Sequence, residues 1–319
     1  MAFDTPPALG LALGSGAARG LAHIGILKVL EEAQIPVYGI AGTSIGAFIG
    51  ALYAAGVPVQ RMEAVACELD WRTLARLLNP TVPTSGLVDG RKLLDFMTEL
   101  LPVHSFEALR LPLAVTATDI ETGEPLIIRK GDLLEALRAA LAFPGIFPPA
   151  RFGDRFLVDG GLCNPVPVDV VRHLGAERVI GVCTIPDVDK QTPETYLPRS
   201  KTNGGHGWHH DLFSAVGIEQ LFRRLVGSGP SPEPPAEANG RKAPGILRVC
   251  AQSVAIMENQ INALRLASNR HDLILRPRCP GITLLEFHRA AEIIAAGELA
   301  ARAALPDIQR LAARHDPEG

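Results

Sequence analysis

Residues 38–50 read Tyr-Gly-Ile-Ala-Gly-Thr-Ser-Ile-Gly-Ala-Phe-Ile-Gly, and this stretch decides the fold. An apolar, β-branched run leads into Gly42-Thr43-Ser44-Ile45-Gly46, and a helix-like run then continues to Ala55. Glycines two residues before and two after a serine suit a sharp turn from a strand into a helix, because side chains at Gly42 and Gly46 would collide there. The turn exposes the Ser44 hydroxyl at a helix N-terminus, where partial positive charge favours a developing alkoxide.

The same stretch has features of a membrane span. No charged residue occurs between Glu32 and Arg61, and glycines recur every fourth position from Gly42 to Gly50, which is the spacing of membrane-helix dimers. Prolines bracket the run, however, and its glycine and hydroxyl residues dilute the apolar character. A buried strand followed by a buried helix explains the pattern better. The glycines then allow the helix to lie close to a sheet.

The composition is that of an ordinary soluble protein. The chain has 319 residues, of which 47% are hydrophobic and 20% charged, with a formal net charge of −3. The near-neutral balance gives no support for nucleic-acid binding, so we expect no nucleic acid partner. The 5 cysteines are scattered within apolar runs, which is typical of free thiols in a reducing compartment. The N-terminus has no basic region or cleavage site. We expect a cytoplasmic protein whose membrane contact, if any, is peripheral.

Strands and helices alternate along the first two thirds of the chain. Residues 8–13 predict a strand, which meets the glycine loop Gly14–Gly20 and then a helix with leucine and isoleucine on one face. Alternation of this kind requires a parallel sheet with helices packed against it. We therefore expect an α/β fold with a mostly parallel central sheet flanked by helices. Further predicted elements are helices within 61–101, strands at 113–119 and 125–129, a helix at 132–142, a hairpin at 151–158, a helix at 165–174 and a strand at 178–184.

Composition changes near residue 186 and divides the chain into three predicted parts. Residues 8–185 form the catalytic core. Residues 186–245 are rich in proline, glycine, histidine and charge, and we interpret them as a flexible insertion or lid. Residues 246–319 form a helical C-terminal part that packs on the core. The smaller elements expected in the last two parts are a short helix near 212–226, an amphipathic helix over 250–264, a strand at 272–275 and a helix over 284–305.

Three loops at predicted strand ends carry the chemistry. They are Gly14–Gly20, the elbow at Ser44, and Asp159-Gly160-Gly161. The carboxyl ends of parallel strands share one edge of a sheet, so these loops can converge there. Acyl transfer needs a nucleophile, a base beside it and donors for the oxyanion. Ser44 is the candidate nucleophile, and Asp159 is the candidate general base. The candidate oxyanion donors are the amides of Ser15, Gly16, Ala17 and Ile45, with supporting roles for Arg19, Gly42, Gly46, Gly160 and Gly161.

Taken together, the three motifs resemble the signature of the patatin-like phospholipase family. That signature is a glycine-rich loop ending in Arg/Lys-Gly, then Gly-x-Ser-x-Gly, then Asp-Gly-Gly/Ala, and all three occur here in order. The resemblance covers about residues 8–185 and implies a patatin-like three-layer fold. It also implies a Ser44–Asp159 dyad without histidine that cleaves acyl esters of phospholipids or related lipids. Where the family often has three consecutive glycines, this chain has Ser15-Gly16-Ala17, and only Gly16 freely adopts a positive φ.

Alternative interpretations remain open at this stage. The order Ser44, Asp159, His271 also fits an α/β-hydrolase triad, for which His173 and His288 are further candidates, although no His-Gly-Gly-Gly loop is present. A catalytically silent protein with the patatin fold is a second alternative. A dinucleotide site is disfavoured, because Arg19 stands where the third glycine of that motif belongs. No cofactor is expected, and no metal either, since the cluster His206, His209 and His210 lacks a ligand pattern.

The dyad makes a physical demand on Asp159. An exposed aspartate, with a pKa of about 3.9, is a poor base for a hydroxyl. We therefore expect burial beside Phe156-Leu157-Val158 to raise its pKa. The segment Phe143–Pro149 and the amphipathic helix over 250–264 are candidates for an acyl groove or a bilayer contact, although core packing is the commoner fate of such residues. Head group, chain preference and oligomeric state have no signature in the sequence.

Overall fold

The computed structural model describes residues 8–69, 73, 90–185 and 246–313. The predicted insertion at 186–245, with its short helix, lies outside these residues, as does most of 70–89. The chain divides into one compact unit of residues 1–186 and 257–319 and a second of 187–256. Helix α9 (Ile246–Ser268) contributes residues to both. All contacts described below belong to the first unit.

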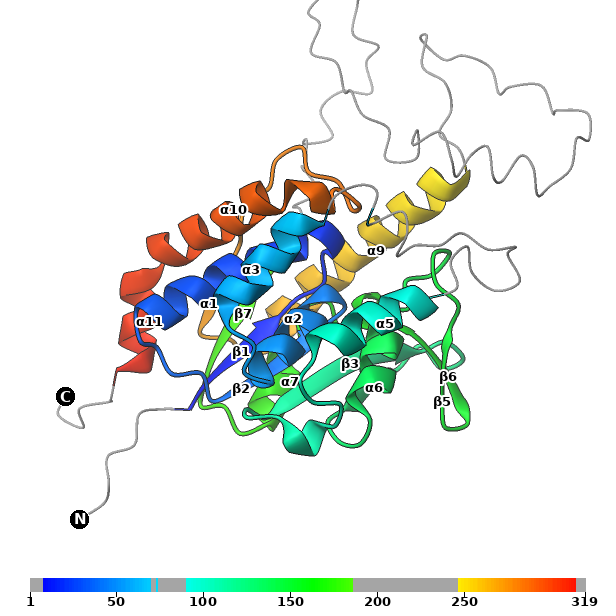
Figure 1. The fold of residues 1–319 in the computed structure, drawn as a ribbon, viewed down its shortest axis with the longest axis horizontal. Helices are drawn as coiled ribbons and strands as arrows, with labels where there is room; N and C mark the ends of the chain where they lie inside the picture. Colours follow the sequence, from blue (N-terminus) through cyan, green and yellow to red (C-terminus); the bar gives the residue numbers. More distant parts are fainter. Residues whose placement is uncertain (1–7, 70–72, 74–89, 186–245, 314–319) are drawn as a thin grey trace, which may run out of the picture. The chain divides into compact units, whose positions relative to one another are not determined.

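An eight-stranded mixed sheet forms the centre of this unit (Figure 1). The parallel strands lie in the order β3-β2-β1-β7-β8. The antiparallel strands β4 and β6 both pair β3, and β5 pairs β6. The fold class expected from the alternating pattern is thus confirmed. The strands are β1 (Leu9–Leu13), β2 (Gly39–Thr43), β3 (Leu113–Asp119), β4 (Pro125–Ile128), β5 (Ala150–Phe152), β6 (Arg155–Asp159), β7 (Arg178–Val182) and β8 (Leu273–Leu275).

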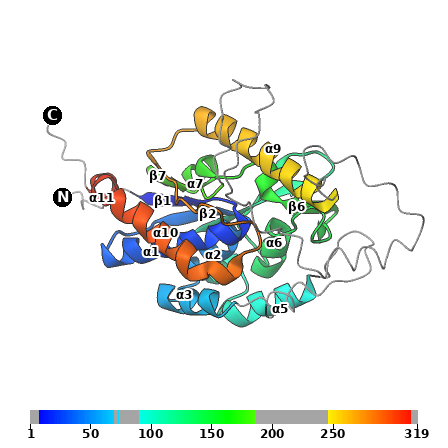
Figure 2. The ribbon, with the colours of Figure 1, turned by 90° about the horizontal axis from the view of Figure 1, so that it is seen from above.

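Helices cover both faces of the sheet. Figure 2 shows α7 on one side and α1, α2 and α10 on the other. Besides α9, the helices are α1 (Ala22–Glu32), α2 (Ile45–Ala54), α3 (Val59–Glu68), α5 (Arg91–Leu100), α6 (Leu133–Ala140), α7 (Val168–His173), α10 (Ala290–Ala303) and α11 (Leu305–Ala312). Short 3₁₀ turns are η1 (Ala17–Leu21), η2 (Phe106–Ala108), η3 (Gly160–Leu162) and η4 (Phe287–Arg289). None of the helices among the described residues is long and apolar enough to cross a bilayer.

Side chains of successive strand residues enter two separate cores. Leu11 and Leu13 of β1 pack in the larger core under α1 and α2, whereas Ala12 between them packs in the smaller core with α7. This alternation is the period of two that a sheet buried on both faces requires. The central strands β1, β2 and β7 are therefore buried and largely apolar, and polar groups gather toward their carboxyl ends.

Two predicted helices differ from the structure at their starts. The helix expected over 165–174 begins only at Val168, with Pro167 as its N-cap. The helix expected over 284–305 is replaced at its start by a turn, in which the Glu286 carboxylate accepts bonds from the amide and hydroxyl of Thr283. A side chain that bonds backbone amides in this way stabilises a turn at the expense of helix. Residues 290–303 and 305–312 then form α10 and α11.

Candidate active site

Ser44 occupies a strained corner between β2 and α2. Its φ is 56° and its ψ is −128°, a conformation that non-glycine residues rarely adopt. The two flanking glycines permit it. A Cβ on Gly42 would lie 2.4 Å from Cα of Ala47, and one on Gly46 would lie 2.2 Å from the carbonyl oxygen of Leu13. The Gly-x-Ser-x-Gly spacing is therefore a steric requirement of this turn, as the sequence predicts.

Strand β3 brings Ser44 and Asp159 together. Its residues 113–116 pair with β2, and its residues 117–119 pair with β6. Because β4 pairs the opposite edge along 115–118, β2 and β6 lie end to end on one edge of β3. Thr43 is the partner of Thr116, and Asp159 is the partner of the next residue, Ala117. Strand β2 therefore ends just before Ser44, at the point along β3 where the pairing with β6 begins. Ser44 and Asp159 consequently lie next to each other.

The two side chains are in direct contact. Ser44 Oγ donates to Oδ2 of Asp159 at 2.5 Å, and the amide of Gly161 donates to Oδ1 at 2.8 Å. A Cβ on Gly160 would lie 2.3 Å from the carbonyl oxygen of Thr116, which explains the glycine after the aspartate. Asp159 is 3% exposed. Burial raises the pKa of Asp159 to about 6, against the opposing effect of the two hydrogen bonds. The carboxylate is thus ionised at neutral pH and a stronger base than an exposed aspartate.

The glycine loop supplies unpaired amides beside this pair. Gly16 has a φ of 158° and Ala17 a φ of 49°. A Cβ on Gly16 would lie 2.1 Å from Oγ1 of Thr184, so glycine is required there. The amide of Ser15 donates to the carbonyl oxygen of Pro165 at 2.9 Å and is already engaged. Among the described residues, the amides of Gly16, Ala17 and Ile45 have no recorded acceptor. They are the amides available to an oxyanion.

A buried histidine holds the glycine loop. His23 is fully buried, and its Nε2 lies 2.8 Å from the carbonyl oxygen of Gly14. Burial lowers the pKa of His23 to about 4, so the ring is neutral and donates through Nε2. His23 therefore supports the loop and is not placed beside Ser44.

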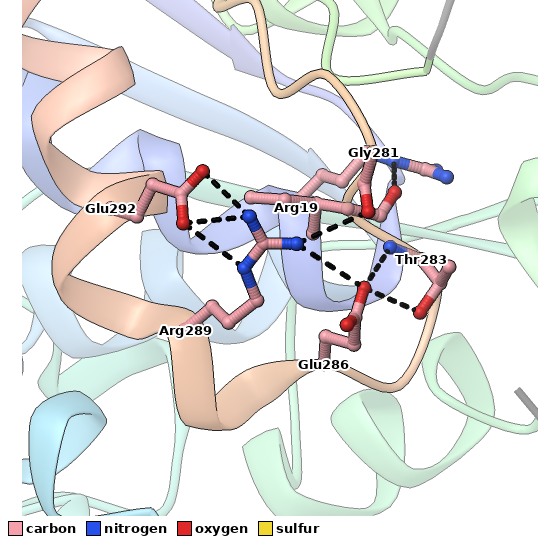
Figure 3. Close-up of polar contacts among 7 residues, drawn as sticks. Arg19, Gly281, Thr283, Glu286, Arg289 and Glu292 are labelled. Carbon is pink, nitrogen blue, oxygen red and sulfur yellow. Dashed lines mark hydrogen bonds and ion pairs between the residues drawn. The ribbon is translucent and has the colours of Figure 1, made fainter. Parts of the chain in front are cut away.

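Arg19 contacts the C-terminal segment. Its Nε donates to the carbonyl oxygen of Ile282 at 2.9 Å (Figure 3). The amide of Ala18 donates to the carbonyl oxygen of Leu284 at 3.0 Å. Arg289 in turn donates to Glu292 and to the carbonyl oxygen of Gly281, which closes the segment into a compact turn. Residues 281–292 therefore clamp the glycine loop from outside. The sequence contains no local signal for this contact, because its partners lie 263 positions apart.

Ser44 and Asp159 line an apolar cavity of about 250 Å³. Ala17 and Ile45, two of the residues whose amides have no acceptor among the described residues, line it as well. Of the segment 143–149 proposed from the sequence for an acyl groove, Phe143, Ile146 and Phe147 contribute to the wall, whereas none of the described side chains of α9, at 252–268, does. The rest of the wall is largely apolar and comes from α2, α3, α5 and the segment 284–287, including Phe48, Met62, Ala66, Leu93, Phe96 and Phe287.

The histidines of the triad alternative lie elsewhere. His173, at the end of α7, and His271 are exposed, and His271 Nδ1 lies 3.0 Å from the carbonyl oxygen of Asn269. His288 is also exposed, and none of the described residues that line the cavity is a histidine. Asp159 contacts Ser44 directly, in the position where a triad has its histidine. The cluster His206, His209 and His210 lies outside the described residues, and within them no group of three His, Cys, Asp or Glu side chains is placed to hold a metal.

Glu258 is a site residue that sequence reasoning missed. It lies on α9 and is 8% exposed, and its Oε1 accepts a bond from Ser15 Oγ at 3.5 Å. A Cβ on Gly161 would lie 2.0 Å from that oxygen. The 4-3-4-3 spacing of apolar residues in this stretch indicates an amphipathic helix, and a glutamate outside that spacing is expected on the solvent-exposed face. No pattern in the sequence marks it as buried.

Comparisons with known proteins show the family to which the chain belongs. The model of the family described as patatin-like phospholipase matches residues 11–172. An NTE family protein of Mycobacterium tuberculosis (strain H37Rv) is 31% identical over 335 residues, which cover 95% of this chain and 92% of that protein. Lysophospholipase nte1 of Aspergillus fumigatus is 30% identical over 293 residues, which cover 91% of this chain but 18% of the larger relative.

Solved structures resemble the chain more distantly. VipD from Legionella pneumophila is 13% identical with a TM-score of 0.47, over 95% of this chain and 68% of that one. The family assignment therefore depends on the sequence matches, which extend across the glycine loop, the elbow and the aspartate loop. The chain belongs to the patatin-like phospholipase family.

Proposed function

We propose that the protein is a serine acyl hydrolase that cleaves ester bonds of phospholipids or related lipids through a Ser44–Asp159 dyad. The observation that carries the proposal is the direct contact of Ser44 Oγ with a buried, ionised Asp159 at the wall of an apolar cavity. A hydroxyl becomes a nucleophile when a base with raised proton affinity takes its proton. The patatin-like phospholipase domain-containing protein 6 of Homo sapiens is 36% identical over 181 residues, which cover 54% of this chain and 13% of that protein, and its name supports a phospholipase.

In the proposed mechanism, Asp159 Oδ2 takes the hydroxyl proton while Ser44 Oγ attacks the ester carbonyl. The resulting oxyanion is held by the amides of Gly16, Ala17 and Ile45, aided by the partial positive charge at the N-terminus of α2. Protonated Asp159 then gives its proton to the leaving alcohol, which leaves an acyl group on Ser44. A water molecule, deprotonated by Asp159, attacks the acyl-enzyme and releases the fatty acid, and the proton returns to Ser44.

The cavity favours substrates with an acyl chain. Its walls are formed largely by aliphatic and aromatic side chains, and each methylene transferred from water into such a site contributes about 0.8 kcal/mol. Activity of the phospholipase A, lysophospholipase or carboxylesterase type fits these walls equally well. The name of the fungal relative, lysophospholipase, supports a lipid with one acyl chain. A cytoplasmic location and peripheral contact with a bilayer belong to the same proposal.

Turnover of a short-chain nitrophenyl ester tests the dyad. Ser44→Ala removes the nucleophile, and Asp159→Asn keeps the shape of the base but not its charge. Each variant should lose roughly 10⁴-fold or more in kcat, the size of loss seen when one member of a catalytic nucleophile–base unit is removed. Circular dichroism checks that each variant remains folded. Turnover like that of the wild type in either variant contradicts the mechanism.

A fluorophosphonate probe separates an active site from a silent one. The probe should label wild-type protein at Ser44, located by mass spectrometry of the labelled peptide, and should not label Ser44→Ala. Ser15→Ala is the matched control, because Ser15 lies nearby but bonds Glu258 and not Asp159. A folded wild-type protein that stays unlabelled would indicate a catalytically silent member of the family.

A further inference from the structure

A carboxyl group that the proposed mechanism does not use lies beside the dyad. Oε1 of Glu258 would be 2.0 Å, and Oδ1 of Asp159 3.2 Å, from a Cβ built on Gly161, so both carboxyls face the same side of this glycine. The amide of Gly161 is the group that holds Oδ1 of Asp159. Glu258 also contacts Ser15, the residue before the available amides of the glycine loop. Glu258 thus lies between the glycine loop and the loop that carries Asp159, and the mechanism depends on the relative position of these two loops.

The surroundings of Glu258 do not favour a charge. In the part of the chain that the structure describes, it has no ion-pair partner, and its one hydrogen bond, from Ser15, is long. Arg19 attracts it only from a distance, with Nε bonded to the carbonyl oxygen of Ile282. Arg265, on the same helix, donates to the carbonyl oxygen of Cys163. A buried carboxylate without a cation beside it is costly, whereas a neutral carboxylic acid is not.

Building on the proposed function, we propose that Glu258 is a positioning residue of the dyad. In its neutral form it braces the Ser15 loop against the Gly161 loop, and loss of its proton stops catalysis at alkaline pH. The substrate does not touch it. Glu258 acts through the position of Asp159, which Gly161 holds, and through the amides that follow Ser15.

The two carboxyls share one negative charge at neutral pH. Burial, with the charge of Asp159 adding to it, raises the pKa of Glu258 to about 8. Asp159 has the lower pKa, about 6, and ionises first. Between the two values the charge is on Asp159, where the mechanism requires a base, and Glu258 holds the remaining proton. Above the pKa of Glu258, both carboxyls around Gly161 are negative.

Ionisation of Glu258 has two opposing effects on the rate. Ionised Glu258 makes Asp159 a stronger base. In general-base catalysis the rate rises by only a fraction of the rise in basicity, so the gain in rate is roughly a few-fold. Ionisation also sets a negative Glu258 on α9 against a negative Asp159, so that repulsion between them displaces the Gly161 loop, and it adds a negative charge near the forming oxyanion. A displacement of about 1 Å in a catalytic group costs up to about 10²-fold. The loss therefore exceeds the gain.

The pH profile of kcat/KM on a water-soluble nitrophenyl ester tests this role of Glu258. Wild-type activity should rise with ionisation of Asp159 near pH 6 and fall with ionisation of Glu258 near pH 8. One pH unit above that pKa, only about a tenth of Glu258 is still protonated, so activity should be down about tenfold. Glu258→Gln keeps the size and the acceptor oxygen but cannot ionise. It should retain the acid limb and lose the alkaline one.

Two further variants sharpen this test. Ser15→Ala removes a hydrogen bond that lowers the pKa of Glu258, so the alkaline limb should move to higher pH. Glu286→Gln is the matched control, because Glu286 also lies in the field of Arg19. Burial acts to raise the pKa of Glu286, but its bonds from Thr283 and the charge of Arg289 outweigh burial and lower it, so Glu286 stays ionised across the range. Its profile should keep both limbs. An alkaline limb that persists in Glu258→Gln overturns the proposal.

The state of Glu258 can also be measured without turnover. In protein labelled with [¹³C]carboxyl glutamate, the resonance that disappears in Glu258→Gln should titrate near pH 8. A resonance that titrates near pH 4, like an exposed glutamate, contradicts the brace even if the enzyme is active. If the wild type hydrolyses no ester while the resonance titrates near pH 8, the proposed function fails and the placement of the neutral carboxyl stands.

Discussion

At the scale of single residues, the strained backbone of Ser44 and the buried carboxyl of Asp159 each lower the stability of the folded state. A non-glycine residue at positive φ persists only where its surroundings hold it, here the two close glycines of the elbow. An aspartate without a cation beside it is tolerated because two donors, Ser44 and Gly161, satisfy its oxygens. Function thus requires features that oppose stability, and removing one of them should stabilise the fold.

Asp159→Asn should stabilise the protein in a pH-dependent way. The folded state raises the pKa of Asp159 to about 6 from 3.8, so between these values the folded protein binds more protons than the unfolded one. The stability that the protonated carboxyl contributes is complete below pH 3.8 and is lost as pH rises through 6. Asp159→Asn cannot lose this stability, so it should be more stable than the wild type by about 3 kcal/mol at pH 7 and by less than about 1 kcal/mol at pH 4.

Urea denaturation of both proteins from pH 4 to 8 checks this. Ser44→Ala serves as the control, because it removes the hydroxyl partner and leaves the carboxyl free to ionise. Its stability should keep the downward slope with pH. A constant difference between Asp159→Asn and the wild type across this range would contradict the raised pKa.

At the scale of elements, local sequence patterns predict what local sterics determine. The Gly-x-Ser-x-Gly and Asp-Gly-Gly motifs have glycine where a Cβ would collide with the backbone of Ala47 and of Thr116. Because this requirement is local, both motifs could be recognised from the sequence. The start of α10 could not, because the turn there depends on the Glu286 side chain bonding Thr283. The burial of Glu258 could not either, since its partner Ser15 lies 243 positions away.

Glycines at the crossing of α1 and α10 offer a test of element packing. A Cβ on Gly297 would lie 2.0 Å from the carbonyl oxygen of Ala22, and one on Gly25 would lie 2.0 Å from that of Ile294. Alanine favours a helix over glycine by about 1 kcal/mol, so propensity alone predicts that Gly297→Ala stabilises the protein. The backbone contact predicts the opposite, a loss of about 1–3 kcal/mol from overpacking.

The sign of the change in unfolding free energy decides between these two effects. Ala295→Gly, at an exposed position of the same helix, measures the propensity term by itself and should destabilise by about 1 kcal/mol. If Gly297→Ala is more stable than the wild type, α1 and α10 do not approach as closely as described.

At the scale of the whole molecule, the cavity depends on segments that no local pattern connects. Its walls come from α2, α3, α5 and residues 284–287, and the glycine loop beside it is clamped by the segment 281–292. The sequence predicts the sheet edge and its three loops, because hydrophobic periodicity and glycine spacing are local properties. It does not predict which helices enclose the space above Ser44, because that depends on long-range packing. Substrate preference is therefore a property of the assembled fold.

Ala66→Phe should shorten the acyl chain that the enzyme prefers. Ala66 is buried on α3 and lines the cavity, so a phenyl ring there occupies space that the chain would fill. Loss of two methylenes of contact corresponds to about 1.6 kcal/mol, or roughly a 15-fold fall in kcat/KM for long-chain esters, while two-carbon esters are unaffected. Ala64→Phe, exposed on the same helix, should leave the whole chain-length series unchanged. Equal losses for short and long esters in Ala66→Phe would indicate general damage to α3, and no loss at all would place the acyl chain outside this cavity.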